Sequence, residues 1–224
     1  MWGDLFLDLL LAALVIALSP ITVIAITLIL STARARANGL AFTAGWLAGL
    51  FVVTALVTLL ADGAEERVDG VTTVVAAIRL LVGILLLVLA ARKFMKRSAG
   101  TEETLPAWMS RIDLIVPGRA LVLGLGLAAA NPKNLAFALV AAAAIAGSGL
   151  TGSEELLAVL LFVGLASLSV LGSLVFYLAM TDRAASGLGR VKDFMARNNA
   201  LIMGLLFAFF GVKLVIGGLT GLVG

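Results

Sequence analysis

The chain has 224 residues, of which 62% are hydrophobic and 13% are charged, and its mean hydropathy is +1.17. A soluble domain is typically about half apolar and about a quarter charged, so this composition excludes an ordinary soluble domain and indicates an integral membrane protein. The chain contains no cysteine and no histidine, which excludes thiol redox chemistry, a disulfide framework and a Cys/His metal site.

The apolar stretches indicate membrane helices rather than a barrel. Each runs for about 20 residues or more, whereas barrel strands alternate over about ten. The formal net charge of +3 would suit nucleic acid, but the basic residues cluster beside the apolar stretches, where membrane orientation explains them better. We therefore expect an all-α protein whose surroundings are the lipid bilayer and which has no nucleic-acid partner.

Six membrane-spanning helices follow from the apolar stretches. The first begins among Asp4 and Asp8 rather than after a basic segment, so we expect a retained span and not a secretory signal. Each stretch is long enough to cross a ~30 Å hydrocarbon core, and the first, fourth and fifth exceed that need, so we expect tilt or a break in them. The predicted spans are residues 5–30, 40–61, 71–91, 120–146, 156–180 and 200–222.

The distribution of lysine and arginine predicts the orientation. The loops after the first, third and fifth spans hold twelve of the 16 basic residues, whereas the other side carries Arg67 among acidic neighbours. Because cytoplasmic loops carry the excess of lysine and arginine, these three loops should be cytoplasmic and both termini should lie outside.

The order of the spans predicts two inverted repeats. Residues 1–97 form the first three-helix repeat, residues 98–119 a cytoplasmic linker, and residues 120–224 the second repeat. Because each half has an odd number of spans, the second half enters the membrane from the opposite side. Ser19-Pro20 then aligns with Asn131-Pro132, and Val82-Gly83 aligns more loosely with Phe210-Gly211. For most of the glycines of these helices we expect close helix packing.

Two polar, proline-containing segments interrupt the first and fourth spans. Pro20 and Pro132 each remove a backbone donor, so the helix should kink or break there. Lys133, beside the second proline, costs roughly 2.5–3.5 kcal/mol at the centre of a membrane helix and should face protein or a wet cavity. Interrupted helices at matching positions in two halves are the best sequence pointer to a transporter site.

The other ionisable groups within the spans are also basic. Arg79 lies close enough to the outer side to extend to the membrane interface, the interpretation we favour for it. Lys133 and Lys213 lie farther from both faces, and no carboxylate is expected at their depth. Each is then either neutral or faces a hydrated cavity and an anion. The nearest acidic groups, Asp8 and Asp62, are expected at the rim.

Four polar residues beside the prolines complete the predicted substrate site. Asn131, Asn134, Ser19 and Thr22 can bond either the freed carbonyls or a ligand, and for Ser19 and Thr22 we favour the backbone role. The broken helices add partial positive charge if their N-termini face the same cavity. With Lys133 and Lys213, these four are the candidate substrate-binding residues.

Nothing in the sequence indicates an enzyme. No histidine and no mid-depth carboxylate is available as a proton relay, and no serine is visibly placed beside a base. We therefore assign no catalytic residue, cofactor or metal.

The chain resembles the LysE superfamily of small exporters, and within it the GAP family of peptidoglycolipid- and sulfolipid-addressing proteins. The resemblance covers nearly the whole chain, and it departs from LysE-type exporters at Gly45-Trp46, where those proteins often carry an acidic residue. The residues that carry it are Leu18-Ser19-Pro20, Pro106-Ala107-Trp108-Met109, Ala130-Asn131-Pro132-Lys133-Asn134-Leu135 and Gly211-Val212-Lys213-Leu214.

The resemblance implies a LysE-like, multi-pass exporter of the bacterial plasma membrane that moves a glycolipid or other anionic amphiphile toward the cell surface. One alternative is export of a small metabolite such as an amino acid. The other is a membrane scaffold that holds lipid-synthesis or export partners through its basic loops. A homodimer through glycine-rich faces is compatible with each.

Overall fold

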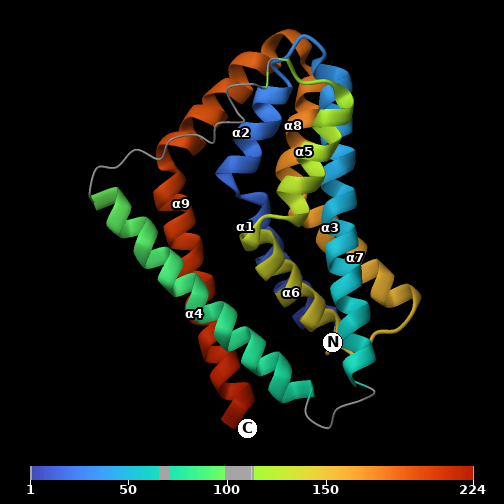
Figure 1. Ribbon diagram of the computed structural model, residues 1–224, viewed down its shortest axis with the longest axis vertical. Helices are drawn as coiled ribbons and strands as arrows, with labels where there is room; N and C mark the ends of the chain where they lie inside the picture. Colours follow the sequence, from blue (N-terminus) through green and yellow to red (C-terminus); the bar gives the residue numbers. More distant parts are fainter. Residues whose placement is uncertain (1, 66–70, 99–111, 113, 224) are drawn as a thin grey trace.

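The computed structural model describes residues 2–65, 71–98, 112 and 114–223. Within these residues the chain forms nine α-helices and no strand, which confirms the all-α prediction (Figure 1). Most of the predicted linker, including Pro106–Met109, lies outside the described residues. The helices are α1 (Trp2–Ala17), α2 (Pro20–Ile29), α3 (Ala35–Glu65), α4 (Val71–Ser98), α5 (Pro117–Ala129), α6 (Pro132–Ala146), α7 (Ser153–Ala166), α8 (Leu168–Ala179) and α9 (Thr181–Val223).

Three of the predicted spans are pairs of bent helices. The first span bends by 56° between α1 and α2, and the fourth bends by 60° between α5 and α6. Pro20 and Pro132 occupy the first turn of α2 and α6, where a missing N–H leaves no helical hydrogen bond unmade. The fifth span bends by 60° between α7 and α8, although no proline lies there. Trp46, fully buried on α3, donates a hydrogen bond from its indole nitrogen to Ser167 Oγ at this bend, over 3.2 Å.

The number of membrane crossings depends on how the bent pairs are counted. Two described segments are long and apolar enough to cross alone, Ala35–Leu60 and Gly187–Val223, and the number rises to as many as five if each bent pair is one span. The third predicted span lies in α4, which is not among these. Six spans and the inverted repeat stay predictions.

The predicted loop after the fifth span is helical instead. α9 is continuous over 43 residues from Thr181, and its first part runs obliquely across the upper end of the molecule before the rest descends beside α4 (Figure 1). The segment contains no proline and includes several alanine and arginine residues, which favour helix. Leu188 packs into the core while Arg190 and Arg197 stay exposed, so the basic segment is an amphipathic start to the last helix.

Close backbone contacts at glycine hold two helix pairs together. A Cβ atom at Gly45 of α3 would clash with the Leu121 carbonyl of α5, and one at Gly124 of α5 would clash with the Phe42 carbonyl of α3. Glycine at these two positions therefore allows the backbones of α3 and α5 to approach closely, as we expected from the sequence.

The pair α4 and α9 meets in the same way. A Cβ at Gly83 would lie 3.0 Å from the Gly211 carbonyl oxygen, and one at Gly211 would lie 3.1 Å from that of Gly83. Figure 1 shows the two helices crossing side by side.

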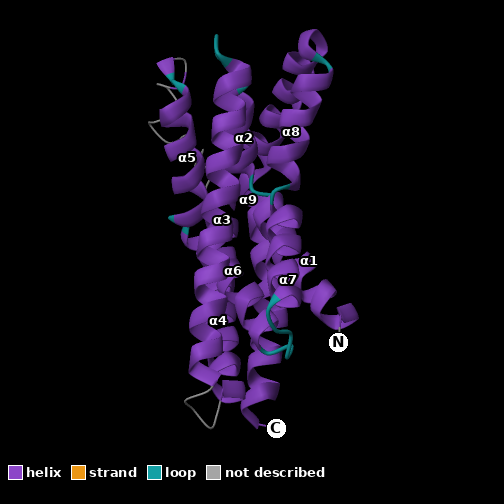
Figure 2. Cartoon of the chain, turned by 90° about the vertical axis from the view of Figure 1, so that its right-hand side faces the viewer, coloured by secondary structure: helices purple, strands orange, loops and turns teal. Residues whose placement is uncertain are grey.

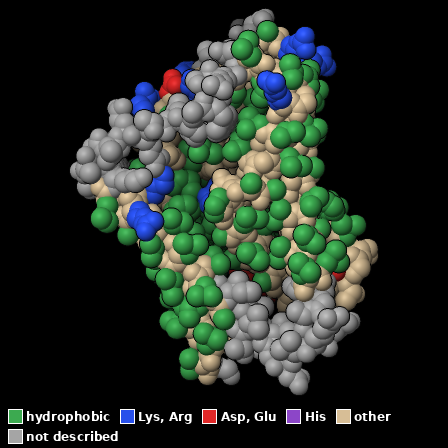
Figure 3. Space-filling view, in the orientation of Figure 1, with side chains coloured by type: hydrophobic (Ala, Val, Ile, Leu, Met, Phe, Trp, Pro, Cys, Tyr) green, Lys and Arg blue, Asp and Glu red, His purple; other side chains and the backbone are tan. Residues whose placement is uncertain are grey.

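Both chain ends lie toward the same end of the molecule (Figure 1 and Figure 2), and the connections α2–α3 and α8–α9 lie at the other. On the face drawn in Figure 3 the lysine and arginine side chains gather over the upper part and near the end of α4, and hydrophobic side chains cover much of the remainder. Leu59, Leu60 and Leu81 are each 66% or 67% exposed. Because soluble monomers rarely expose large apolar patches, this surface fits a protein surrounded by lipid.

Candidate functional site

The two proline breaks are joined by the side chain of Lys133. Its Nζ donates a hydrogen bond to the Val15 carbonyl oxygen over 2.8 Å, which connects the start of α6 to the last turn of α1. That carbonyl is available because the Ser19 N–H, its ordinary helical partner, bonds the Ile16 carbonyl instead. A cation at a helix C-terminus also meets the negative end of the helix dipole. This contact brings the two breaks together.

The two asparagines of the break bond the backbone. Asn131 is the N-cap of α6, and its Oδ1 accepts from the Lys133 backbone N–H over 3.0 Å. Asn134 donates from Nδ2 to the Leu127 carbonyl over 2.9 Å and so links α6 back to α5. Its other amide atom, Oδ1, is buried and has no hydrogen-bond partner among the described residues. Asn134 therefore retains an acceptor that the fold does not use.

Ser19 and Thr22 do not take the backbone role that we favoured for them. Ser19 stands at the N-cap of α2, but its side chain makes no capping hydrogen bond. Thr22 is fully buried, and its hydroxyl has no partner in the described part of the chain. Thr22 and Asn134 are both the third residue of the helix that follows a proline break, so each break presents one unsatisfied buried oxygen.

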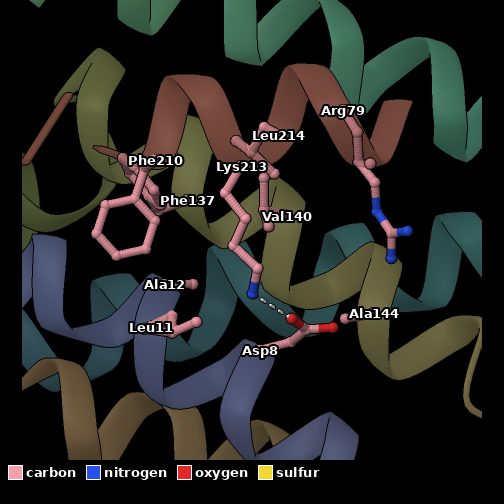
Figure 4. A pocket seen from close by; sticks show the side chains of 11 residues that line it. Asp8, Leu11, Ala12, Arg79, Phe137, Val140, Ala144, Phe210, Lys213 and Leu214 are labelled. Atoms are coloured by element: carbon pink, nitrogen blue, oxygen red, sulfur yellow. Dashed lines mark hydrogen bonds and ion pairs between the residues drawn. The ribbon is translucent and has the colours of Figure 1, made fainter. Parts of the chain in front are cut away.

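Lys213 has a carboxylate partner, contrary to the expectation that none lies at its depth. Its Nζ donates to Asp8 Oδ1 over 2.8 Å, and the two side chains are 43% and 42% exposed. Asp8 was expected at the rim, but its side chain reaches Lys213 of α9. The bond forms the wall of a cavity of about 90 Å³ between α1, α4, α6 and α9 (Figure 4).

Arg79 lies in the same cavity and not apart from the site. Its side chain extends from α4 toward the space that holds Asp8 and Lys213 (Figure 4). No hydrogen bond or ion pair joins it to another described residue. Sequence reasoning omitted Arg79 and Asp8 from the site. No signal in the sequence identifies them, because 205 residues separate Asp8 from Lys213 and Arg79 comes from a third helix.

The cavity and the Lys133 contact lie along the same two helix faces. Asp8, Leu11 and Ala12 line the cavity below Val15 on α1, and Phe137, Val140 and Ala144 line it below Lys133 on α6 at helical spacing. A buried edge-to-face pair lines the cavity, with the ring centroids of Phe137 and Phe210 5.5 Å apart. Phe137 follows Lys133 by one helical turn on α6, so this aromatic contact lies next to both polar sites.

No group of three or more acidic residues in the described ranges is spaced to hold a metal ion. The polar groups of this region are basic side chains, the Asp8 carboxylate, and amide or hydroxyl groups beside an apolar wall, a set in which cations outnumber the carboxylate and which suits recognition of an anion.

Comparison with known proteins gives one family. The model described as SfLAP, "Sap, sulfolipid-1-addressing protein", matches residues 9–220 and so spans both proline breaks and Lys213. No curated protein and no solved structure matches.

Proposed function

Because this chain belongs to the sulfolipid-1-addressing protein family, we propose that it is an exporter-like membrane protein that takes part in moving a polar glycolipid, or a similar anionic amphiphile, toward the cell surface. The region between the two proline breaks would receive the anionic headgroup. This agrees with the resemblance to the GAP family within the LysE superfamily.

One observation carries the proposal: Lys133 bridges the two broken helices through a backbone carbonyl and not through a carboxylate. Irregular backbone within a membrane is tolerated where it is buried in protein or lines a cavity, and paired broken helices are the usual place for a transported solute. A hydrogen bond between an ammonium and a neutral acceptor contributes a net free energy of about 1.5–3 kcal/mol. A headgroup anion binds a lysine more strongly, so it can replace the Val15 carbonyl.

The proposed architecture is six spans in two inverted repeats. The two bends at proline, 56° and 60°, are alike and occupy equivalent places. Gly83 and Gly211, which align between the halves, face each other across the contact of α4 with α9, as residues beside a two-fold axis would. An even number of crossings agrees with both chain ends lying toward one end of the molecule.

The test is the substitution Lys133→Met. This variant keeps the length of the side chain and removes the charge, so it should insert and fold normally but no longer deliver lipid. We expect one surface glycolipid to disappear from cell-surface extracts and to accumulate inside, as measured by lipidomics of surface and whole-cell extracts. Lys192→Met, on the basic start of α9 and away from both breaks, is the matched control and should behave as the wild type.

Other outcomes point elsewhere. If the Lys133→Met variant had the wild-type amount of the glycolipid at the cell surface, Lys133 would have only a packing role, and the proposed headgroup site would lose its support. Unchanged lipid after deletion of the whole protein, with new sensitivity to an amino acid or other metabolite, would favour small-metabolite export. A scaffold would be favoured by a different pattern. The surface lipid would be lost when the protein is deleted and when its basic loops are neutralised, but it would be retained in the Lys133→Met variant.

A further inference from the structure

The cavity between α1, α4, α6 and α9 brings together three charges from three helices. Asp8 comes from α1, Arg79 from α4 and Lys213 from α9, and all three side chains reach the same space (Figure 4). Two cations and one carboxylate leave this wall with a formal charge of +1. Arg79 has no bonded partner among the described residues, so none of their side chains neutralises the excess positive charge.

The rest of the wall is apolar. Phe137, Val140, Phe210 and Leu214 line the cavity beside the charges. Because the charges stand beside apolar protein, part of the field between Arg79 and an anion passes through a medium of lower dielectric constant than water, which strengthens their attraction. The same side chains can cover the first carbons of an amphiphile whose headgroup lies at the cations.

The Asp8–Lys213 pair is able to open. Its side chains are 42% and 43% exposed, and ion pairs with this exposure are weak because water competes for both partners. The cavity measures about 90 Å³, several times what a single ordered water needs, so an oxyanion can enter beside the pair. An acyl chain or a sugar exceeds this space and would extend out of it.

From these observations, and resting on the proposed function, we propose that the cavity is a second subsite, apart from the Lys133 contact, and that it binds the singly charged oxyanion of an amphiphile, such as a sulfate ester or a phosphodiester. Arg79 and Lys213 hold its oxygens. Asp8 is an internal substitute for the ligand: it neutralises Lys213 in the empty site and is displaced when the headgroup binds.

The proposal predicts opposite effects for the two partners of one ion pair. Asp8→Asn removes the internal competitor, so the oxyanion should bind more tightly. Lys213→Met and Arg79→Gln each remove a cation, so it should bind more weakly, by about tenfold for each charge-assisted hydrogen bond lost. A pair that served only to fasten α1 to α9 would lose stability in either variant and would show no such opposition.

The experiment measures binding of defined lipids to the purified full-length chain by native mass spectrometry. The probes are a galactosylceramide bearing a single sulfate ester, the same galactosylceramide without the sulfate, and phosphatidylglycerol as a singly charged phosphodiester. Arg190→Gln, an exposed arginine at the start of α9, controls for general attraction to anionic lipid. Thermal unfolding of each variant in the same detergent identifies any that have lost their fold.

We expect the sulfated lipid to bind more tightly than its uncharged counterpart, to bind more tightly still to Asp8→Asn, and to be weakened by Arg79→Gln and Lys213→Met but not by Arg190→Gln. Stronger binding of phosphatidylglycerol than of the sulfated lipid would assign the site to phosphodiesters. Equal binding of charged and uncharged lipid, or weaker binding to a folded Asp8→Asn variant, would overturn the inference. The proposed function would then still stand or fall on Lys133→Met, because that variant leaves this cavity intact.

Discussion

At the scale of single residues, the break between α5 and α6 is stabilised by side chains that replace missing backbone bonds. Pro132 has no N–H to donate, and Asn131 offers its own oxygen to the Lys133 N–H at 3.0 Å. Asn134 supplies a donor to the Leu127 carbonyl, which the interrupted helix would otherwise leave unpaired. Each polar residue of the motif therefore satisfies a particular backbone atom that the proline has exposed.

The cap at Asn131 leads to a prediction about stability. Asn131→Ala removes the acceptor for the Lys133 N–H, and loss of an N-cap typically costs about 1 kcal/mol. We expect this loss in reversible unfolding of the purified protein in mixed micelles titrated with SDS. Asn131→Ser keeps a side-chain acceptor and should recover most of the stability; equal stabilities for the alanine and serine variants would show that the cap is not formed.

The chemistry of the breaks could be predicted from the sequence because proline and asparagine act on backbone atoms within a few residues of themselves. The contact of Asp8 with Lys213 could not, since 205 residues separate the two and only the tertiary arrangement of the helices brings their side chains together. The same holds for Arg79, whose place beside Asp8 depends on how α4 lies on α9. Lys133 was only partly predictable. The sequence showed that it lies beside the break at Pro132, but it did not show that its Nζ donates to the Val15 carbonyl oxygen.

At the scale of the helices, glycine decides which pairs come closest. Gly124 and Gly126 lie two residues apart on α5, and the sequence alone does not show which of them packs against another helix. A Cβ at Gly124 would run into the backbone of α3 at Phe42, whereas one at Gly126 would meet nothing within 4 Å. The two positions thus provide a pair of identical substitutions with opposite surroundings.

We expect Gly124→Ala to destabilise the protein by about 1–3 kcal/mol, because α3 and α5 must separate to admit the methyl group. Gly126→Ala should leave the stability unchanged or slightly raised, since alanine favours helix over glycine. Both are measured by the same SDS titration. A Gly124→Ala variant as stable as Gly126→Ala would mean that α3 and α5 do not pack at this distance.

The sequence was less informative about two other elements. The bend at Ser167 has no proline, and the hydrogen bond from Trp46 that accompanies it comes from a helix 121 residues away in the chain. The first part of α9 was expected to be a loop because its charges suggested a surface segment. Its charges do lie on the surface, but helix formers and buried Leu188 make the segment helical.

At the scale of the whole molecule, the orientation in the membrane rests on the basic residues at one end. The connection before α3 carries Arg34, and the start of α9 carries Arg190 and Arg197. Figure 1 places the connection α2–α3 and the junction α8–α9 at the end opposite to both termini. If basic segments remain in the cytoplasm, both termini are outside, and α4 must then be a crossing in addition to the five that length and composition allow.

Cysteine labelling can test this arrangement without interference, because the chain has no cysteine of its own. Gly3→Cys, Thr151→Cys and Val223→Cys introduce thiols at exposed positions near the end that holds the termini. They should react with a membrane-impermeant maleimide in intact cells.

Ala33→Cys and Arg190→Cys, exposed at the opposite end, should react only after the cells are permeabilised, which also shows that each thiol is accessible. Six crossings require Gly3→Cys and Val223→Cys to be labelled from the same side, because an even number of spans returns the chain to the side from which it started. With five crossings the two would be labelled from opposite sides, and α4 would then lie along the membrane surface or against the protein. Labelling of Gly3→Cys and Val223→Cys only after permeabilisation, with Ala33→Cys reacting in intact cells, would keep the even count but reverse the orientation inferred from the basic residues.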